Sequence, residues 1–312
     1  MSNINPLQRP GSQLLGTDAF KLFLIEFGGM VLNAFNTKTK FLDKHTLRTI
    51  KHGRGERFDA LGEAGVLYHT PGSDLSTQGQ QIKHDTFDIL VDAKLISHLY
   101  VDEIEDAMNH FELKQRYAGK LGTALAKALD ANIGRCAILA ARHAARVPDG
   151  FGGSVISNAL MATDIPTLTK GLFDAQVTMD NKDVPEDGRV CFVRPTFYSM
   201  LAQNLDLINS LYRGTGSIAE GEIMKVAGFT IIKSNTVPNT NVTNSYNSKY
   251  DGDFSKTVGV CMTEEAVGTV QLKGLSTEAH WDFNRQAWFL AAKFCLGHGV
   301  LRPECSVELK AA

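Results

Sequence analysis

The chain has 312 residues, of which 43% are hydrophobic and 21% charged, enough for a buried core in one large or two modest domains. A formal net charge of −2 provides no dense positive face for phosphate groups, so sequence-specific DNA binding is not expected. The five cysteines are scattered and include no C-x-x-C pair. Neither a zinc ribbon nor a disulfide framework is indicated, and reduced thiols in a cytoplasm are the simple interpretation.

The charge is distributed unevenly along the first third of the chain. Residues 1–57 carry nine Lys and Arg against four Asp and Glu, whereas residues 58–101 carry two against six. Neighbouring segments therefore have opposite sign. The first apolar run, residues 20–27, contains Lys21 and Glu26 and is far shorter than the roughly 20 residues of a membrane span. No export signal and no membrane anchor are expected.

Residues 1–16 are polar and rich in turn formers, and a tail is expected there. An amphipathic helix follows from Asp18, because apolar residues recur at spacings of three and four. These residues are Phe20, Phe23, Leu24, Phe27, Val31 and Phe35. Gly28 and Gly29 lie inside this helix, where each costs about 1 kcal/mol relative to alanine. They indicate a packing notch or a hinge, and the notch is favoured.

Residues 46–92 have the composition of extended β structure. Strands are predicted at 46–51 and 66–69, and near 87–91, where apolar and acidic residues alternate. Between them, residues 71–81 are rich in Gly and Gln and too polar for a core. This excursion indicates a projecting hairpin or loop.

Residues 102–147 contain no proline and predict one long helix. The segment opens on acids and closes on bases, as the helix macrodipole favours, and Asp102 with Glu105 resembles a capping box. Pro148 and Gly150 would end it. Such a helix would be about 69 Å long, against about 50 Å for a compact globule of this size. We therefore expect a helix that overhangs the body, in a protein that is incomplete as a monomer.

The remainder alternates between helices and strands. The expected elements are a turn at 150–153, a helix carrying Leu168, Leu172, Ala175, Val177 and Met179, a strand at 190–193, a helix at 196–204, strands at 229–232 and 258–262, and a loop at 239–248. Residues 165–278 are predicted to form an α/β lobe. The last strands, 281–294 and 300–309, are expected to pair around a turn at Gly297-His298-Gly299.

No pattern indicates catalysis or a cofactor. The glycines at 214–221 have a spacing like that of a phosphate-binding loop, but Glu222 stands where the lysine should be. No H-x-x-x-H pair presents two imidazoles to a metal, and no G-x-S-x-G is present. His298 is either a ligand or, as we favour, a turn residue bonded to local backbone. We expect no enzyme, no cofactor and no metal.

Three stretches resemble major capsid proteins of T7-like short-tailed (podovirus- or autographivirus-type) double-stranded DNA phages. They are LFLIEFGGMVLNAF at 22–35, DEIEDAMNH at 102–110 and GHGVLRPE at 297–304, with shorter echoes IKH at 82–84 and AVGTVQLK at 266–273. The stretches stand in the same order and at broadly similar spacing, and the resemblance covers most of the chain. Residues 1–17, 148–164 and 235–257 match poorly.

This resemblance implies an α+β fold, the Hong Kong 97-type phage capsid fold. Its parts would be an N-terminal arm at 1–48, an extended loop at 49–85, a peripheral domain at 86–164 with spine helix 102–147, an axial domain at 165–278, and a return to the peripheral domain at 279–312. The implied function is a capsid subunit that forms hexamers and pentamers of an icosahedral head around double-stranded DNA. The implied partners are further copies, a separate scaffolding protein, and portal and tail proteins, with packaged DNA nearby. The implied location is the virion, after assembly in the host cytoplasm.

The candidates for subunit contacts are an aromatic stripe on the arm helix and a set of opposite charges. They are Phe20, Phe23, Phe27, Phe35, Arg48, Lys51, Arg54, Arg57, Asp59, Glu63, Asp74 and Asp85. The stripe would be buried on a neighbouring copy, and the arm bases would meet loop acids, unless the charges are simply solvated. Two alternatives stay open: an encapsulin-type cargo shell, and an unrelated soluble α/β enzyme.

Overall fold

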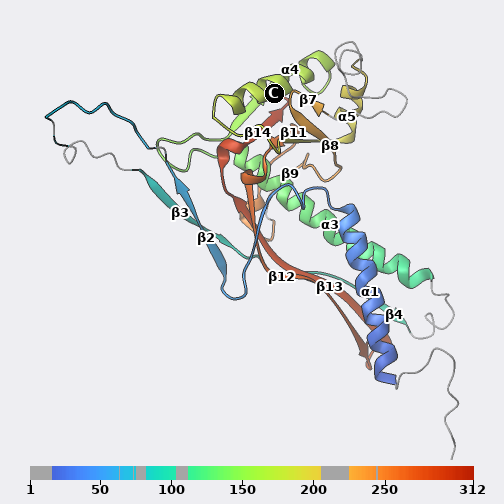
Figure 1. Ribbon diagram of the computed structural model, residues 1–312. Coiled ribbons are helices and arrows are strands. Elements are labelled where there is room, and N and C mark those ends of the chain that lie inside the picture. Colours follow the sequence, from blue (N-terminus) through green and yellow to red (C-terminus); the bar gives the residue numbers. More distant parts are fainter. Residues whose placement is uncertain are drawn as a thin grey trace, which may run out of the picture. The chain divides into compact units, whose positions relative to one another are not determined.

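The computed structural model describes residues 16–62, 64–72, 74, 82–102, 112–204, 225–243 and 245–312 (Figure 1). The chain divides into two compact units. The first unit comprises residues 1–39, 94–128 and 273–295, and the second comprises 40–93, 129–272 and 296–312. Three long elements contribute residues to both: α3 (Glu112–Ala141), β12 (Val267–Asp282) and β13 (Ala287–Val300).

The first unit packs helix α1 (Gly16–Lys38) against a β-sheet. Strand β4 (Leu95–Asp102) pairs antiparallel with β13, from Ala287 opposite Asp102 to Phe294 opposite Leu95. The predicted apolar stripe faces inward where the structure describes its side chains: Phe27, Val31 and Phe35 are buried. The ring of Phe35 meets that of Phe294 edge-on, with centroids 6.1 Å apart.

The glycines of α1 and α3 mark places where the chain approaches closely. A Cβ at Gly28 would lie 2.8 Å from Thr277 Oγ1 on β12, which confirms the packing notch at that position, whereas Gly29 has open space. On α3, a Cβ at Gly122 would lie 2.5 Å from the carbonyl oxygen of Val31. The crossing of α1 and α3 therefore needs a residue without a side chain.

The predicted helix over 102–147 is wrong at both ends. Asp102 is the last residue of β4, where it pairs with Ala287, and residues 103–111 lie outside the described part. The helix ends at Ala141, and the guanidinium of the next residue, Arg142, is bound to the buried Glu308 through two hydrogen bonds of 2.6 Å. The 30 residues of α3 span about 45 Å at 1.5 Å per residue. The described helix is therefore shorter than a compact globule of this size, and its length is no argument for an incomplete monomer.

The second unit contains a six-stranded sheet in the order β5-β14-β11-β6-β8-β7. Its strands are β5 (Ser154–Ser157), β14 (Ser306–Lys310), β11 (Thr257–Met262), β6 (Val190–Val193), β8 (Phe229–Lys233) and β7 (Lys225–Val226). Strands β6 and β11 are buried throughout, as expected for continuous apolar runs. A short two-stranded sheet pairs β9 (Asn241–Val242) with β10 (Gly252–Asp253).

Two helices lie alongside this sheet (Figure 1). Helix α4 (Ile165–Asp180) packs against β5 and β14, and α5 (Pro195–Ala202) packs against β8. Asp164 caps α4 by accepting a hydrogen bond of 3.1 Å from the backbone N–H of Thr167. The predicted inward face of α4 is confirmed except at Val177, which is exposed.

The predicted pairing of the last two strands is wrong. Strand β13 runs through Gly297-His298-Gly299 without turning, and β14 pairs with β11 and β5. The two glycines serve close approach: a Cβ at Gly297 would lie 2.1 Å from the carbonyl oxygen of Leu90, and one at Gly299 would lie 2.9 Å from Ile89 Cγ1. Glycine is needed here for space beside another strand.

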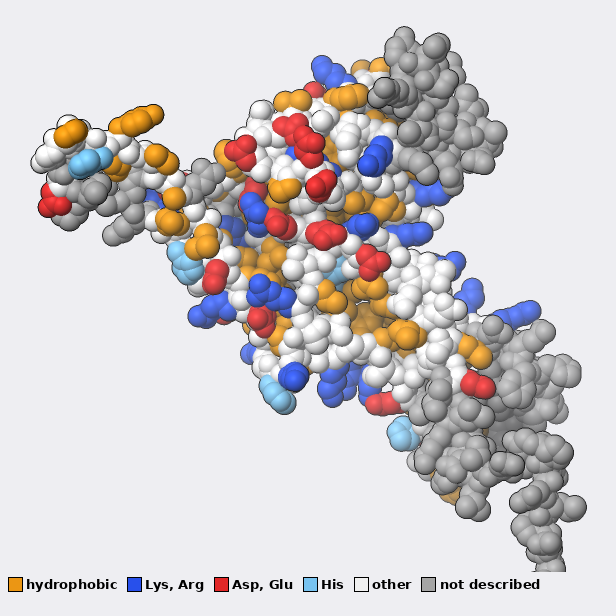
Figure 2. Space-filling view, in the orientation of Figure 1, with side chains coloured by type: hydrophobic (Ala, Val, Ile, Leu, Met, Phe, Trp, Pro, Cys, Tyr) orange, Lys and Arg blue, Asp and Glu red, His pale blue; other side chains and the backbone are white. Residues whose placement is uncertain are grey.

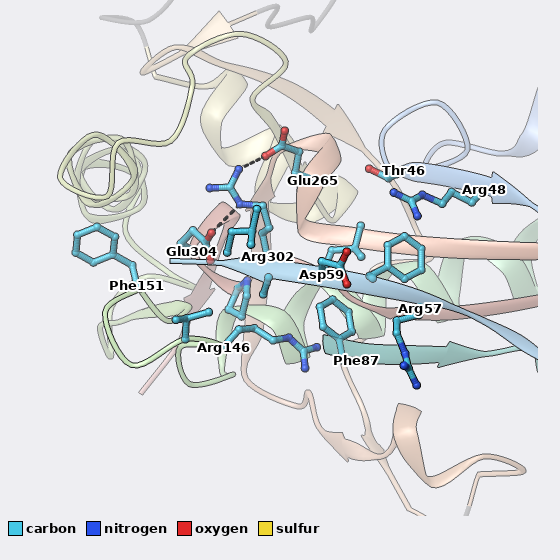
Figure 3. Close-up of a pocket in the computed structure, with 17 residues that line it drawn as sticks. Thr46, Arg48, Arg57, Asp59, Phe87, Arg146, Phe151, Glu265, Arg302 and Glu304 are labelled. Atoms are coloured by element: carbon cyan, nitrogen blue, oxygen red, sulfur yellow. Dashed lines mark hydrogen bonds and ion pairs between the residues drawn. The ribbon is translucent and has the colours of Figure 1, made fainter. Parts of the chain in front are cut away.

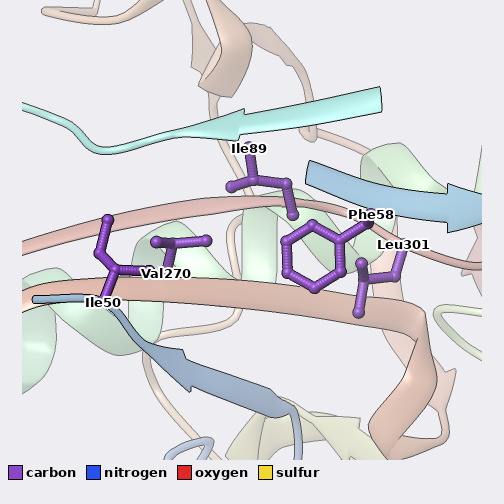
Figure 4. Close-up of a cluster of buried hydrophobic side chains, with 5 residues drawn as sticks. All are labelled: Ile50, Phe58, Ile89, Val270 and Leu301. Carbon is purple, nitrogen blue, oxygen red and sulfur yellow. The ribbon is translucent and has the colours of Figure 1, made fainter. Parts of the chain in front are cut away.

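That neighbouring strand belongs to a hairpin whose base is anchored in the second unit. Strands β2 (Gly55–Leu61) and β3 (His84–Leu90) pair antiparallel, and β1 (Thr46–Thr49) pairs parallel with β12. A small buried core joins these strands (Figure 4). Its members are Ile50, Phe58, Ile89, Val270 and Leu301. No strand forms at 66–69, contrary to the prediction.

Among the described residues, no helix is both long enough and apolar enough to cross a membrane.

Replacing Gly122 by alanine should destabilise the subunit by about 1–3 kcal/mol, because the new methyl group would overlap the backbone of α1. Gly119→Ala is the matched control on the same helix, since a Cβ there meets no atom within 4 Å. This control should stabilise the subunit by about 0.5–1 kcal/mol. Urea unfolding of unassembled subunits measures both, and similar effects from the two variants would contradict the close crossing.

Candidate subunit interface

The hairpin β2–β3 leads into an extended segment whose apolar side chains are uncovered. Val66 is 94% exposed and Tyr68 is 101% exposed, and Leu67 between them is also exposed. We call these three residues the apolar loop segment. Apolar side chains also gather towards this end of the molecule in Figure 2, and Leu61 and Ile82 add to them. Contiguous exposed apolar side chains mark interaction sites.

A pocket of about 510 Å³ lies beside the base of the hairpin (Figure 3). Its walls combine three aromatic rings with four arginines. They are Phe58, Phe87, Phe151, Arg48, Arg57, Arg146 and Arg302. Acidic side chains also line it, namely Asp59, Glu265 and Glu304. The pocket suits a ligand or segment that has both apolar and charged groups.

Three of these arginines are paired within the chain. Arg57 Nε donates to Asp88 Oδ1 at 2.9 Å across the hairpin, and this bond lowers the pKa of Asp88. Arg48 Nη1 lies 3.6 Å from Glu56 Oε1, and its guanidinium lies 4.4 Å from the centre of the Phe58 ring.

Arg302 binds two glutamates. Its Nε donates to Glu304 Oε1 at 2.7 Å, and its Nη1 donates to Glu265 Oε2. Arg302 therefore bridges η4 (Glu264–Ala266) and η5 (Pro303–Cys305).

Arg146 is held differently from the other three. Its guanidinium lies 3.9 Å from the centre of the Phe87 ring, and Nη2 donates to the carbonyl oxygen of Val300 at 2.6 Å. Burial lowers the pKa of Arg146, and the charge of Asp85 opposes that effect. Sequence reasoning missed Arg146 as a pocket residue because it was assigned to the end of the predicted helix.

The comparisons with known proteins decide the family. Residues 61–310 match the family described as Gp10A-like, Major capsid protein, which is more than half of the chain. The chain belongs to the Gp10A-like major capsid proteins. It is a structural subunit of a phage virion and not an enzyme, and it assembles into a shell of many subunits.

Relatives in other phages match this capsid protein over nearly its whole length. It is 29% identical to the major capsid protein of Escherichia phage T7, covering 95% of this chain and 96% of that protein. The capsid structure of cyanophage P-SCSP1u has 36% identity and a TM-score of 0.81, covering 88% of each chain. The mature capsid of bacteriophage PhiM1 has the same fold at 20% identity and a TM-score of 0.73. The α+β, Hong Kong 97-type fold is thereby confirmed.

The structure changes the expectation for the arm stripe of this capsid protein. Phe27 and Phe35 are buried inside their own chain, so this part of the predicted stripe is not available to a neighbour. The reason is that β13 and α3 already cover it, as the contact with Phe294 and the close approach at Gly122 show. The side chains of Phe20 and Phe23 lie outside the described part.

The predicted charged contacts divide into two groups. Arg48 and Arg57 bind acids of their own chain, and Asp85 accepts a hydrogen bond from the Thr86 N–H at 2.9 Å. Lys51, Arg54, Asp59 and Asp74 are exposed, with His84 Nε2 3.8 Å from Asp59 Oδ1. Glu63 lies outside the described residues.

His298 lies in a buried polar cluster close to the base of the hairpin. Its Nδ1 is 2.8 Å from Thr269 Oγ1, and its backbone N–H donates to the Tyr250 hydroxyl at 3.3 Å. Tyr250 in turn donates to Asp92, which also forms an ion pair of 2.6 Å with Lys249. His298 lies inside β13 and its ring is bonded to the Thr269 side chain, so the predicted turn residue bonded to local backbone is wrong.

Both buried histidines of this cluster are kept neutral. Burial lowers the pKa of His298 to about 3, and the nearby charges of His45 and Lys249 add to the shift. The ring of His45 lies 6.5 Å from that of His298, and burial lowers its pKa too, although Phe41, Asp43 and Glu264 oppose this. Protonation of either imidazole would place a charge in a dry site.

We expect acid to destabilise the subunit through His298. The unfolded chain binds a proton near pH 6.5 and the folded chain only near pH 3, so stability is complete above pH 6.5 and falls below it. Below pH 6.5 the free energy of unfolding falls by about 1.4 kcal/mol for each pH unit. In His298→Gln, which cannot take up a proton, the urea midpoint should be lower at pH 8, and the gap to wild type should narrow between pH 6.5 and 4. A gap that stays constant would refute a neutral His298.

Proposed function

We propose that copies of this chain form hexamers and pentamers of an icosahedral phage head around double-stranded DNA. The observation that supports this is the apolar loop segment, whose side chains one copy leaves exposed in a family of shell subunits. A contact between the loop segment of one copy and a different surface of the next is heterologous, and such contacts form a ring when the rotation between copies closes. Assembly in the host cytoplasm, with a separate scaffolding protein and with portal and tail proteins, completes the proposal.

We also propose the division of the chain that the resemblance implies. The arm is 1–48, the extended loop 49–85, the peripheral domain 86–164, the axial domain 165–278 and the return 279–312. The six-stranded sheet of the proposed axial domain takes β5 and β14 from outside 165–278. Lys51, Arg54, Asp59 and Asp74 stay candidates for contacts between copies, since all four are exposed.

Weak contacts suit a shell. Many copies multiply each contact, so individual interfaces need only modest strength. With a net charge of −2 per copy, the protein offers little general attraction for phosphates, and the wall would not hold the genome by non-specific binding.

An encapsulin-type cargo shell, the alternative left open by the sequence, would share the fold and differ in its contents, and the family match favours the phage head. The contents of purified particles distinguish the two functions. Double-stranded DNA inside particles from infected cells supports the phage head. An enclosed cargo protein in place of DNA contradicts the phage head. The absence of any particles in negative-stain micrographs would also contradict it.

The double variant Val66→Ser/Tyr68→Ser should fold normally and fail to form shells. Its unfolding free energy should stay within about 0.5 kcal/mol of wild type, because neither side chain is buried in the subunit. Each would contribute about 1.5–3 kcal/mol if buried against another copy. Tyr246→Ser is the matched control, since Tyr246 is an exposed tyrosine outside the loop. Sedimentation and microscopy give the result, and normal shells from the double variant would exclude this contact.

A further inference from the structure

Arg146 carries a buried donor that the described part of its own chain leaves without a partner. Its guanidinium is fixed in place by the Phe87 ring and by the carbonyl oxygen of Val300. Its Nε is buried and has no hydrogen-bond partner among the described residues. A buried donor without a partner is costly, so such a group calls for an explanation.

The other arginines of the pocket show what Arg146 lacks. Arg48, Arg57 and Arg302 each contact at least one carboxylate of the same chain. Arg146 forms no ion pair within the described part of the chain, although Asp85 acts on it electrostatically. Figure 3 shows the Arg146 side chain reaching towards Phe87, with the pocket lined by both.

We propose that this pocket receives a carboxylate side chain from a second copy of the chain, and that Arg146 binds it. The inference rests on the proposed shell function. A guanidinium with free N–H groups favours a planar carboxylate, which it binds through charge-assisted hydrogen bonds. The apolar walls formed by Phe58, Phe87 and Phe151 would hold the stem of the incoming side chain.

Each copy carries carboxylates that are available for such a contact. Asp183, Glu186 and Asp187 lie in the turn after α4, and all three are exposed. None of them forms an ion pair among the described residues. A volume of about 510 Å³ leaves room for one side chain and part of its backbone.

The first experiment compares assembly of Arg146→Gln, Arg146→Lys and the control Lys170→Gln, which removes one exposed positive charge on α4. We expect Arg146→Gln to raise the subunit concentration needed for shells about tenfold, equivalent to about 1.4 kcal/mol per subunit. Arg146→Lys should rescue only in part, because lysine cannot bind a carboxylate with two parallel bonds. Lys170→Gln should match wild type. Normal assembly of Arg146→Gln would overturn the proposal.

The second experiment identifies the occupant without altering Arg146. Phe151, which lines the pocket and is 43% exposed, is replaced by the photo-reactive benzoylphenylalanine, and assembled particles are irradiated. Mixing isotope-labelled and unlabelled subunits before assembly separates links between copies from links within one. A link between copies to a peptide containing Asp or Glu is the expected result.

The other outcomes of the second experiment each count against a stated claim. Links only within one chain, or links between copies to peptides without an acid, would overturn the carboxylate proposal while leaving the shell function intact. If wild-type subunits form no shells at all, the proposed shell function fails first, and the inference fails with it.

Discussion

The extended loop depends on a close approach of strands at the base of its hairpin. Gly297 and Gly299 leave space on β13 for the backbone of Leu90 and the side chain of Ile89. Ile89 then completes the small core that ties β2 and β3 to β12 and β13. Beyond that core no described residue buries Val66 or Tyr68. The base is a finished folded structure, while the end is a surface that a single copy leaves uncovered.

The charged residues around the base stabilise the subunit more directly than they select a partner. Arg57 and Asp88 pair across the hairpin, and Arg302 joins two short helices, so these side chains are committed within one chain. Exposed pairs of this kind contribute at most about 1 kcal/mol each. Their arginines line the pocket together with Arg146, which is held instead by the Phe87 ring and the carbonyl oxygen of Val300. Selection of a partner would then depend on a group such as Arg146, which forms no ion pair among the described residues.

Sequence periodicity predicted those elements whose apolar residues are continuous or recur on one face. Helices α1 and α4 and strands β6, β8 and β11 follow from apolar spacing, because one face or the whole segment is buried. The wrong predictions of secondary structure arose where the same residue type is common in two different local structures. Gly297 and Gly299 suit both a turn and a close approach, and Asp102 suits both a helix cap and a strand end.

The same limit applies to the candidate site. Arginines at 48 and 57 are visible in the sequence, but the choice between an acid of the same chain and one of a neighbour depends on tertiary geometry. Val66 and Tyr68 had the composition of a strand, and only the structure showed that no partner strand is present within the described residues. The resemblance to capsid proteins indicated the fold and function from motifs in register, which local physics alone did not supply.

The buried polar cluster makes the base of the hairpin costly to move. Asp92 lies two residues after β3 and is bound by Tyr250 and Lys249, and the Tyr250 hydroxyl accepts a hydrogen bond from the N–H of His298. Moving Asp92 would remove a partner from the buried Tyr250 hydroxyl, at about 1–3 kcal/mol, and from the partly buried Lys249 and Asn247. The described residues between Leu61 and Ile82 have no comparable buried network. Moving the described residues between Leu61 and Ile82 therefore costs less than moving the base of the hairpin, which forms part of the wall of the pocket.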